Sequence, residues 1–393
     1  MAAGNRNRLS FKAESTWGTE PGGNYQELRK LGDAGITLDR AQIRTAEWNS
    51  RRAVTGMRLG NKSVGVNVPF ELSYGTYDTL IESAFYSTWT AAASAITALT
   101  ATVVAGTTNT IGATGINAGI VAGDWVKISG FVAPYTANNG FFKVTVSASN
   151  LLTLGQAKAP DGTSLLAACS AQTGISVQRV GYIVPGTTAK SLAFEEAQLD
   201  LSTGNYTQAL GCIADSFNLS LAPDAIITGN FAFLGKTFNG PANATYGGTV
   251  VAAGTDEVMQ SNDAYTKLWL DGSATCAATA FDFSLSNGGS RVMPVFCNEP
   301  NKITADDALF TGNVTMLRED AAMLTKYLNE TDLAISSKIL DKTGTNGYAL
   351  EFPKVRITAH NLQRAKDNVL VTLPWTALEY STTFNACKIW KLV

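Results

Sequence analysis

The chain has 393 residues, five cysteines, one histidine and a formal net charge of −2 at pH 7. This length suits two or three domains, and the near-neutral charge argues against a nucleic-acid-binding protein. Charged residues make up 16% of the chain, below the norm of about 25%. No apolar run reaches the length of a membrane span, and the N-terminus lacks the apolar stretch of a secretion signal. We therefore expect a soluble, β-rich protein made in the cytoplasm.

Residues that commonly build catalytic or metal sites are sparse. The five cysteines are scattered without Cys-x-x-Cys spacing, which predicts buried reduced thiols. A catalytic triad or multi-histidine site would depend on His360 alone, and we interpret this residue as a polar residue at a strand end. The acid pairs Glu195–Glu196 and Asp306–Asp307 point to opposite faces of a strand, so we interpret both as solvated. We predict no catalytic residue, no metal site and no cofactor.

The first strong element is a strand that runs directly into a helix. In SVGVNVPFELS, residues 63–73, one face is apolar and the other, with Asn67 and Glu71, is polar. The segment that follows, YGTYDTLIESAFYSTW, has apolar residues at helical spacing on one side. An alternating segment at 32–44, GDAGITLDRAQIR, comes before them and predicts another strand.

Residues 92–180 have a different character. They are nearly uncharged and rich in Ala, Thr and Gly, and they hold short strand-like segments, such as DWVKISG and FFKVTVS, separated by turn signals. We interpret this stretch as a small β-domain inserted at a surface loop, and we expect it to be dispensable for the surrounding unit.

The strand–helix pattern occurs again after residue 278. ALFTGNVTML, residues 308–317, alternates as 63–73 does and runs into the helix pattern REDAAMLTKYLN, while TAFDFSLSNGG precedes it. Segments 190–221 and 331–359 also match in pattern, as an internal duplication requires. We therefore predict a mainly β protein with two tandem sandwich or barrel units, each with one flanking α-helix. The first unit is discontinuous, at 1–91 and 181–240, and the second spans 241–393.

Two loops between the predicted strands carry basic residues. WNSRRAVTGMRLGNK occupies 48–62, and NGGSRVMPVFCNEPNKIT occupies the corresponding place in the second unit. The first loop lacks the interleaved aromatics of a nucleic-acid-binding patch. We interpret both loops as arms that contact neighbouring subunits, with ordinary loops as the alternative. The residues assigned to these arms are Arg51, Arg52, Arg58, Lys62, Arg291 and Lys302.

The order and spacing of these segments resemble the major tail tube protein of long-tailed, siphovirus-like bacteriophages. The segments that carry the likeness are KAESTWGTEPGGNYQELRKLGD, RLGNKSVGVNVPFELSYGTYDTLIESAF, GDWVKISGF with NNGFFKV, and then SLSNGG, FTGNVTML and YALEFPKVRI. The likeness covers nearly the whole chain. This family has no catalytic residues, so none is carried over.

The resemblance implies a structural virion protein. Subunits of such tubes resemble β-sandwiches flanked by a helix, and their sheets join side by side around a channel for double-stranded DNA. The implied partners are other copies of the chain, the tape measure and tail terminator proteins, and DNA that passes without sequence-specific binding. A surface or carbohydrate-binding β protein is the alternative, followed by a β-rich hydrolase.

The duplication sets an expectation for symmetry. A ring of this kind normally contains six units, so three chains with two units each are expected to close it, with six chains as the alternative. We expect the polar strand faces to line the channel, and we expect the arms to join one ring to the next by ion pairs. An acidic wall is expected because a cationic wall would retain DNA phosphates. The residues assigned to the channel are Asp39, Asn67, Glu71, Asp282, Ser284, Asn313 and Thr315.

Overall fold

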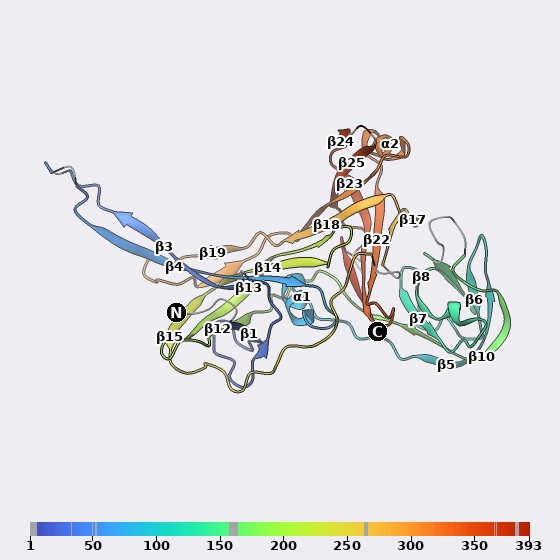
Figure 1. Ribbon diagram of the computed structural model, residues 1–393, viewed down its shortest axis with the longest axis horizontal. Helices are drawn as coiled ribbons and strands as arrows, with labels where there is room; N and C mark the ends of the chain where they lie inside the picture. The colour runs from blue at the N-terminus through green and yellow to red at the C-terminus, as the bar shows by residue number, and fades with distance from the viewer. Residues whose placement is uncertain are drawn as a thin grey trace.

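The computed structural model is an elongated, mainly β molecule. It describes residues 6–32, 34–48, 50–51, 53–156, 164–262, 266–364, 366, 368–381 and 385–393. Strands make up 52% of the chain and helices 5%, so the prediction of a mainly β fold is confirmed. A long β-ribbon projects from one side of the central body, and a small barrel lies on the other side (Figure 1).

One antiparallel sheet runs through the central body. Its strands follow in the order β3 (Gly35–Arg44), β4 (Met57–Glu71), β14 (Thr228–Gly235), β13 (Tyr206–Leu221), β18 (Ala278–Ser286), β21 (Leu309–Leu317), β25 (Val369–Ala377), and then β23 (Gly347–Ile357) with β24 (Asn361–Arg364). We call β3, β4, β14 and β13 the first repeat, and β18, β21, β25 and β23–β24 the second repeat. The two repeats meet where β13 pairs with β18.

Shorter ladders complete the body on either side of this sheet. Beside the first repeat lie β2 (Gln26–Glu27), β1 (Asn7–Ala13), β12 (Leu192–Gln198) and β15 (Thr237–Ala242). Beside the second lie β17 (Ser273–Thr275), β16 (Lys267–Leu270), β22 (Leu333–Leu340), β26 (Lys388–Leu392) and β11 (Gly181–Ile183). Strand β13 belongs to both ladders of the first repeat, because it bends near Gly211, whose φ of +66° favours glycine.

The two repeats correspond residue by residue. Strands β12 and β22 both open on Leu-Ala, at 192–193 and 333–334. The paired residues can be followed from strand to strand, starting at these positions. In the first repeat the path through β13 and β14 matches the same position in β4 as the path through β23 and β25 matches in β21, so that Asn67 corresponds to Asn313. The same two residues align in the sequence patterns GVNV and TGNV. Geometry and sequence therefore give one correspondence between the repeats.

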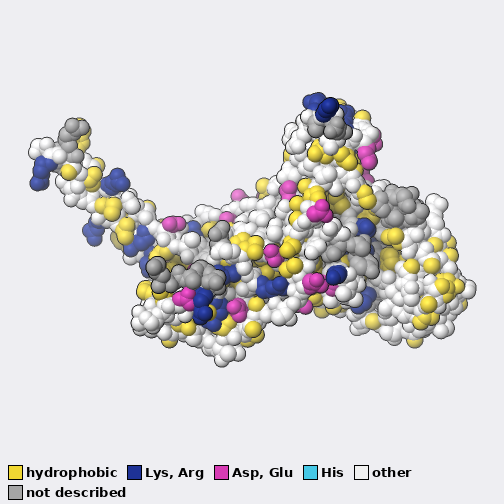
Figure 2. All heavy atoms as spheres, viewed as in Figure 1, with side chains coloured by type: hydrophobic (Ala, Val, Ile, Leu, Met, Phe, Trp, Pro, Cys, Tyr) yellow, Lys and Arg dark blue, Asp and Glu magenta, His cyan; other side chains and the backbone are white. Residues whose placement is uncertain are grey.

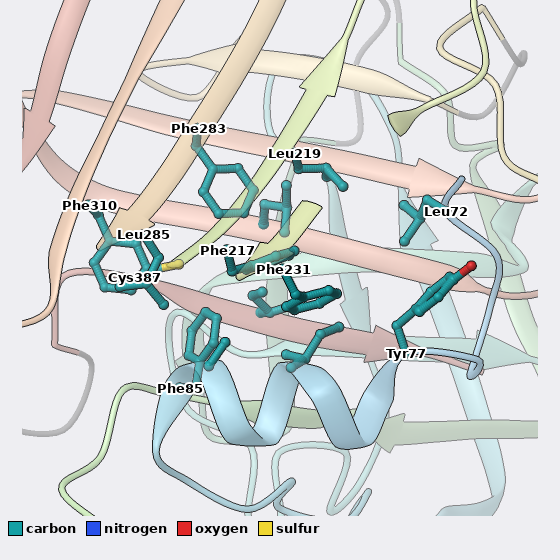
Figure 3. Close-up of a cluster of buried hydrophobic side chains, with 14 of the residues drawn as sticks. Leu72, Tyr77, Phe85, Phe217, Leu219, Phe231, Phe283, Leu285, Phe310 and Cys387 are labelled. Atoms are coloured by element: carbon teal, nitrogen blue, oxygen red, sulfur yellow. The ribbon is translucent and has the colours of Figure 1, made fainter. Parts of the chain in front are cut away.

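The apolar faces of both repeats contribute to one hydrophobic core. Phe217 of β13 stacks on Phe231 with ring centroids 4.5 Å apart, and it meets Phe283 of the second repeat edge-on at 5.4 Å. Helix α1 (Asp78–Phe85) covers this core, and its Phe85 contacts Phe310 of β21 (Figure 3). The repeats are therefore joined by packing as well as by strand pairing.

The two helices are placed differently. Helix α1 buries five residues, whereas α2 (Ala322–Leu328) has none buried, and Leu328 is exposed. Asp320 accepts a 2.8 Å hydrogen bond from the amide of Ala322, so the acids at 319–320 precede the helix. Tyr327 and Leu328 on the predicted apolar side of the second helix are exposed, although Met323 packs against the core. Helix α2 lies at the far end of the second repeat (Figure 1).

Residues 96–156 and 164–179 form a closed barrel with its own core. Its strands run in the order β10 (Cys169–Arg179), β5 (Ile96–Val104), β6 (Thr110–Gly112), β9 (Leu151–Gly155), β8 (Gly140–Ala148) and β7 (Trp125–Ser129). A 3-10 turn, η2 (Thr136–Asn138), precedes β8. The barrel interior is a separate hydrophobic cluster.

The barrel docks against the second repeat through a buried carboxylate. Glu351 of β23 accepts hydrogen bonds from the indole nitrogens of Trp125 at 2.9 Å and Trp390 at 3.2 Å, and Lys143 of the barrel pairs with it at 2.6 Å. Burial lowers the pKa of nearby Lys388 to about 8, although Asp124 and Glu351 favour its charged form. Removing the barrel would therefore expose apolar rings and take away two partners of a buried carboxylate, Trp125 and Lys143. The insert is tied more closely to the body than its sequence suggests.

We predict that the two repeats unfold together. Phe283→Ala leaves a cavity in the shared core and should lower the free energy of unfolding by about 3–5 kcal/mol. Far-ultraviolet circular dichroism and tryptophan fluorescence should report one coincident, shifted transition during chemical denaturation. Val146→Ala, at an exposed position of the barrel, is the control. Two separate transitions, only one of them shifted, would show that the repeats are independent.

Candidate functional site

The face of the large sheet opposite the core is polar and continuous across both repeats. Its residues form rows through directly paired positions. One row holds Glu71, Thr228, Ser220, Asp282, Asn313 and Pro374. The next row holds Pro69, Asn230, Asn218, Ser284, Thr311 and Thr376.

The structure brings all seven predicted channel residues together on this polar face. Asp39 pairs with Ser63, and Asn67 lies four residues further along β4. Thr315 shares a 3.1 Å hydrogen bond with Thr372. Sequence reasoning missed the polar residues of three strands, β13, β14 and β25. Polar and apolar residues alternate along these strands, and this pattern could have identified the polar face. The missed residues include Asn218, Ser220, Thr228, Asn230, Thr372 and Thr376.

Acidic and neutral groups dominate this polar face. Asp39, Glu71 and Asp282 are acidic, and Asp282 accepts hydrogen bonds from the Asn313 amide at 3.2 Å and from its side chain at 3.0 Å. Among the basic groups, Arg356 lies at the β23 end and pairs with Asp332 at 2.7 Å. Such a face offers little to hold a phosphate backbone.

The first predicted arm is the distal part of the β3–β4 ribbon. It carries basic and apolar side chains along its length (Figure 2). Arg51 and Arg58 are exposed, and Trp48 near the tip is 100% exposed. Arg52 lies outside the described residues. Lys62, at the base, is engaged within the chain, where it pairs with Glu299 at 3.3 Å.

The second predicted arm contacts the first repeat of its own chain. It consists of β19 (Ser290–Val292) and β20 (Lys302–Thr304) with the loop between them. The Arg291 guanidinium donates to the Val64 carbonyl, and at 3.4 Å to that of Gly235. Lys302 is exposed, and so are Val295 and Phe296 in the loop. This hairpin therefore shows how an arm can lie across a neighbouring repeat.

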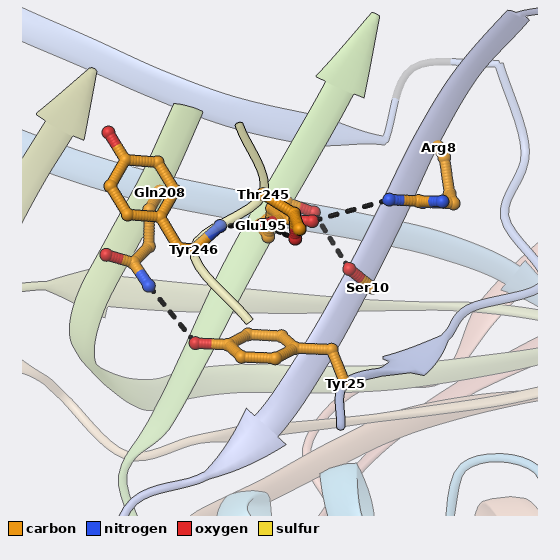
Figure 4. Close-up of polar contacts among 7 residues, drawn as sticks. All are labelled: Arg8, Ser10, Tyr25, Glu195, Gln208, Thr245 and Tyr246. Carbon is orange, nitrogen blue, oxygen red and sulfur yellow. Dashed lines mark hydrogen bonds and ion pairs between the residues drawn. The ribbon is translucent and has the colours of Figure 1, made fainter. Parts of the chain in front are cut away.

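Glu195 is buried, so its interpretation as a solvated acid is wrong. Its carboxylate accepts hydrogen bonds from the Thr245 hydroxyl and the Tyr246 amide, each at 2.7 Å, and lies 3.4 Å from the Arg8 guanidinium (Figure 4). Glu196 points elsewhere and accepts from the Ile36 amide at 2.8 Å. Glu195 thus fastens the segment that links the repeats to β12. Asp306 and Asp307 are exposed, as expected.

The arrangement near Glu195 is structural. Tyr25 hydrogen bonds to Glu20 at 2.8 Å, and burial together with Glu20 raises the pKa of this phenol. The described residues contain no group of three or more His, Cys, Asp and Glu that could hold a metal ion. His360 lies between β23 and β24, at a strand end as predicted.

The cysteines form no disulfide. All five are free; Cys169, Cys212 and Cys387 are buried, but Cys276 and Cys297 are exposed. The prediction of buried thiols is therefore wrong for these two, because they lie in surface loops whose exposure the spacing does not reveal. Among the helices that the structure describes, none has the length and apolarity to cross a membrane.

A family model for the phage tail tube protein matches residues 4–377. The chain therefore belongs to the phage tail tube protein family. A search of curated proteins finds no match. Membership places the chain among the structural proteins of the virion tail, which assemble with themselves and with other tail proteins, and not in an enzyme family.

We predict that Glu195 stabilises the fold through its buried contacts. Glu195→Ala leaves Arg8, Thr245 and the Tyr246 amide without their shared acceptor, which should lower the free energy of unfolding by about 3 kcal/mol. Chemical denaturation would measure the change. Glu319→Ala, at an exposed position, should stay within about 0.5 kcal/mol of the parent. Equal stability of the two variants would contradict the assigned role.

Proposed function

We propose that this chain closes into rings that stack as a tail tube and conduct double-stranded DNA to the host cell. The observation that carries the proposal is the seam between β13 and β18, where Ser216 to Leu221 pair with Ser286 to Phe281. Through this seam one chain already joins two corresponding repeats side by side. Their polar faces form one surface, which would be the channel wall.

The two outer edges of the sheet support further extension by the same pairing. Strand β3 has β4 as its strand partner among the described residues, and β24 pairs with β25. Asn361 of β24 pairs with Thr372, as Asn218 of β13 pairs with Asn230. Strand β24 therefore holds the place in the second repeat that the seam portion of β13 holds in the first.

Side-chain exposure agrees with a missing neighbour at β3. Leu38 of β3 pairs with Val64, and Leu285 of β18 pairs with Phe310. Val64 and Phe310 occupy corresponding positions in the two repeats, so Leu38 corresponds to Leu285. Leu285 is fully buried, whereas Leu38 is 39% exposed. A second copy that pairs its β24 with β3 would cover Leu38 as β13 covers Leu285.

The ring would contain three chains and six repeats, with head-to-tail contacts around a closed cycle. Tape measure and tail terminator proteins would be further partners, and DNA would pass the polar face without sequence-specific binding. Synthesis in the host cytoplasm, followed by assembly into the tail, fits this role. The charge on the polar face supports passage, because it gives phosphates few cations to bind.

We predict three copies per ring. Purified protein, or tails isolated from particles, should show rings or hollow tubes by electron microscopy. A cryo-EM reconstruction should show threefold symmetry, with alternating first and second repeats around the wall. Six copies in each ring layer would contradict the three-chain arrangement, and protein that never forms rings would contradict the proposed function.

We predict that positive charge on the polar face slows DNA passage. Glu71→Lys combined with Asp282→Lys should leave tube assembly intact but slow DNA ejection from particles, because the new ammonium groups attract phosphates. Asp256→Lys combined with Glu257→Lys makes the same change in charge at exposed positions next to Val258, which pairs with Ser73 beside α1, on the core side of the sheet. Ejection kinetics equal to those of this control would remove the polar face from the channel.

A further inference from the structure

We propose that the base of the first arm, residues 40–44 and 57–62, binds across the second repeat of an adjacent copy in the same ring. The inference rests on the proposed ring and identifies one of its contacts. The proposed contact resembles one within the chain, where the β19–β20 hairpin lies across the first repeat. The partner is thus a second copy of this chain.

The seated hairpin uses one cross-strand pair to grip the first repeat. Arg291 and Ile303 are directly opposite each other on β19 and β20. Arg291 donates to the carbonyls of Val64, in the middle of β4, and Gly235, at the end of β14, and Ile303 is only 8% exposed. Nearer the tip, Glu299 accepts a 2.7 Å hydrogen bond from Thr237. One guanidinium and one apolar side chain therefore form the centre of the contact.

The first arm has the same pair at the corresponding position. Arg44 and Met57 are directly opposite each other on β3 and β4. Met57 precedes Asn67 by ten residues, as Ile303 precedes Asn313 (67 − 57 and 313 − 303). Gly35 pairs with Asn67 and Asp282 pairs with Asn313, so Gly35 and Asp282 correspond. Arg44 follows Gly35 by nine residues, as Arg291 follows Asp282.

The difference between the two pairs is burial. Met57 is 54% exposed and Arg44 is exposed, whereas Ile303 is covered. Ile43 and Leu59 beside them are exposed as well. A ribbon with this many uncovered apolar groups is typical of an interaction surface. The first arm therefore has the contact residues of the seated hairpin without a repeat beneath it.

The second repeat provides the corresponding seat. The ladder registers match Val64 with Phe310 and Gly235 with Ala377, so the seat is the start of β21 and the end of β25. Residues 305–309 and 379–380 at this place are exposed. They include the acids Asp306, Asp307 and Glu379, and the arm base carries Arg40, Arg44 and Arg58. The charges of arm and seat are complementary.

Strand order places this contact within a ring. The seated hairpin leaves β18 and reaches β14 and β4, on the far side of the seam strand β13. An arm that leaves β3 in the same way would pass the neighbour's β24 edge and reach its β25 and β21. This differs from the ring-to-ring role expected from the sequence. Both the ribbon and the hairpin extend toward the same side of the molecule (Figure 1).

Photocrosslinking tests the seat directly. Met57→p-benzoylphenylalanine would be assembled into tubes, irradiated, separated on denaturing gels and mapped by mass spectrometry. The expected adducts join position 57 to peptides containing 305–311 or 377–380 of another copy, and the gel ladder should end at three chains. Ile303→p-benzoylphenylalanine is the control, and it should give adducts within one chain near Val64 and Gly235.

The outcomes separate the contact from the ring model. A ladder that ends at six chains, with the same mapped peptides, would support the seat and overturn the three-chain ring. An open-ended ladder with adducts elsewhere would overturn the seat and indicate contacts between rings. Adducts confined to single chains in assembled tubes would also overturn it.

A charge change tests the same contact by assembly. Arg44→Glu should reduce tube yield at least about tenfold, because the carbonyl acceptors and nearby acids would face a carboxylate. Arg44→Lys keeps the charge and should retain part of the yield. Both variants should match the parent in circular dichroism and melting temperature, since the arm lies outside the core. Parental tube yield for Arg44→Glu would overturn the proposal.

Discussion

The backbone edge of β13 is the feature on which the architecture depends. A strand edge exposes unpaired amide and carbonyl groups, which must find water or another strand. In this chain the edge of the first repeat is satisfied by β18, the first strand of the second repeat. Among the described residues, β24 pairs with β25 and β3 with β4, so the outer backbone edges of both strands are available for the same kind of pairing. In the proposed ring, the contact between β24 of one copy and β3 of the next would repeat the β13–β18 pairing that joins the two repeats within the chain.

Alternation along the strands gives this sheet its two different faces. The apolar face is covered by α1 and by the shorter ladders beside each repeat. On this face Phe217 of the first repeat contacts Phe283 of the second. The opposite face is polar, and neither described helix lies across it. A sheet that is dry on one side and wet on the other can border an aqueous space while its remaining side chains form a core. This division separates what holds the subunit together from what DNA would meet.

Two buried carboxylates fasten segments that strand pairing alone does not hold. Glu195 binds the segment between the repeats, and Glu351 binds the inserted barrel through Trp125 and Lys143. Each acid is satisfied by several donors, which is the condition for placing a charge inside a protein. The linker and the barrel are therefore fixed parts of the molecule. At the base of the first arm, by contrast, apolar side chains such as Ile43 and Met57 are exposed.

The sequence alone determined the periodic features of this protein. A strand has a side-chain period of two, so SVGVNVPFELS and ALFTGNVTML specify which residues share a face, and their recurrence reveals the repeats. Only the tertiary structure decided which strands became neighbours. The β13–β18 seam, the burial of Glu195 and the attachment of Arg291 to the first repeat join residues far apart in the chain. Helix α2 is a further example, because its apolar side was predicted from the sequence but none of its residues is fully buried. The sequence pattern does not indicate which surface, if any, covers such a side. Alternation within a strand follows from backbone geometry. Pairing between distant strands depends on how whole surfaces fit together, and a short segment of sequence does not contain that information.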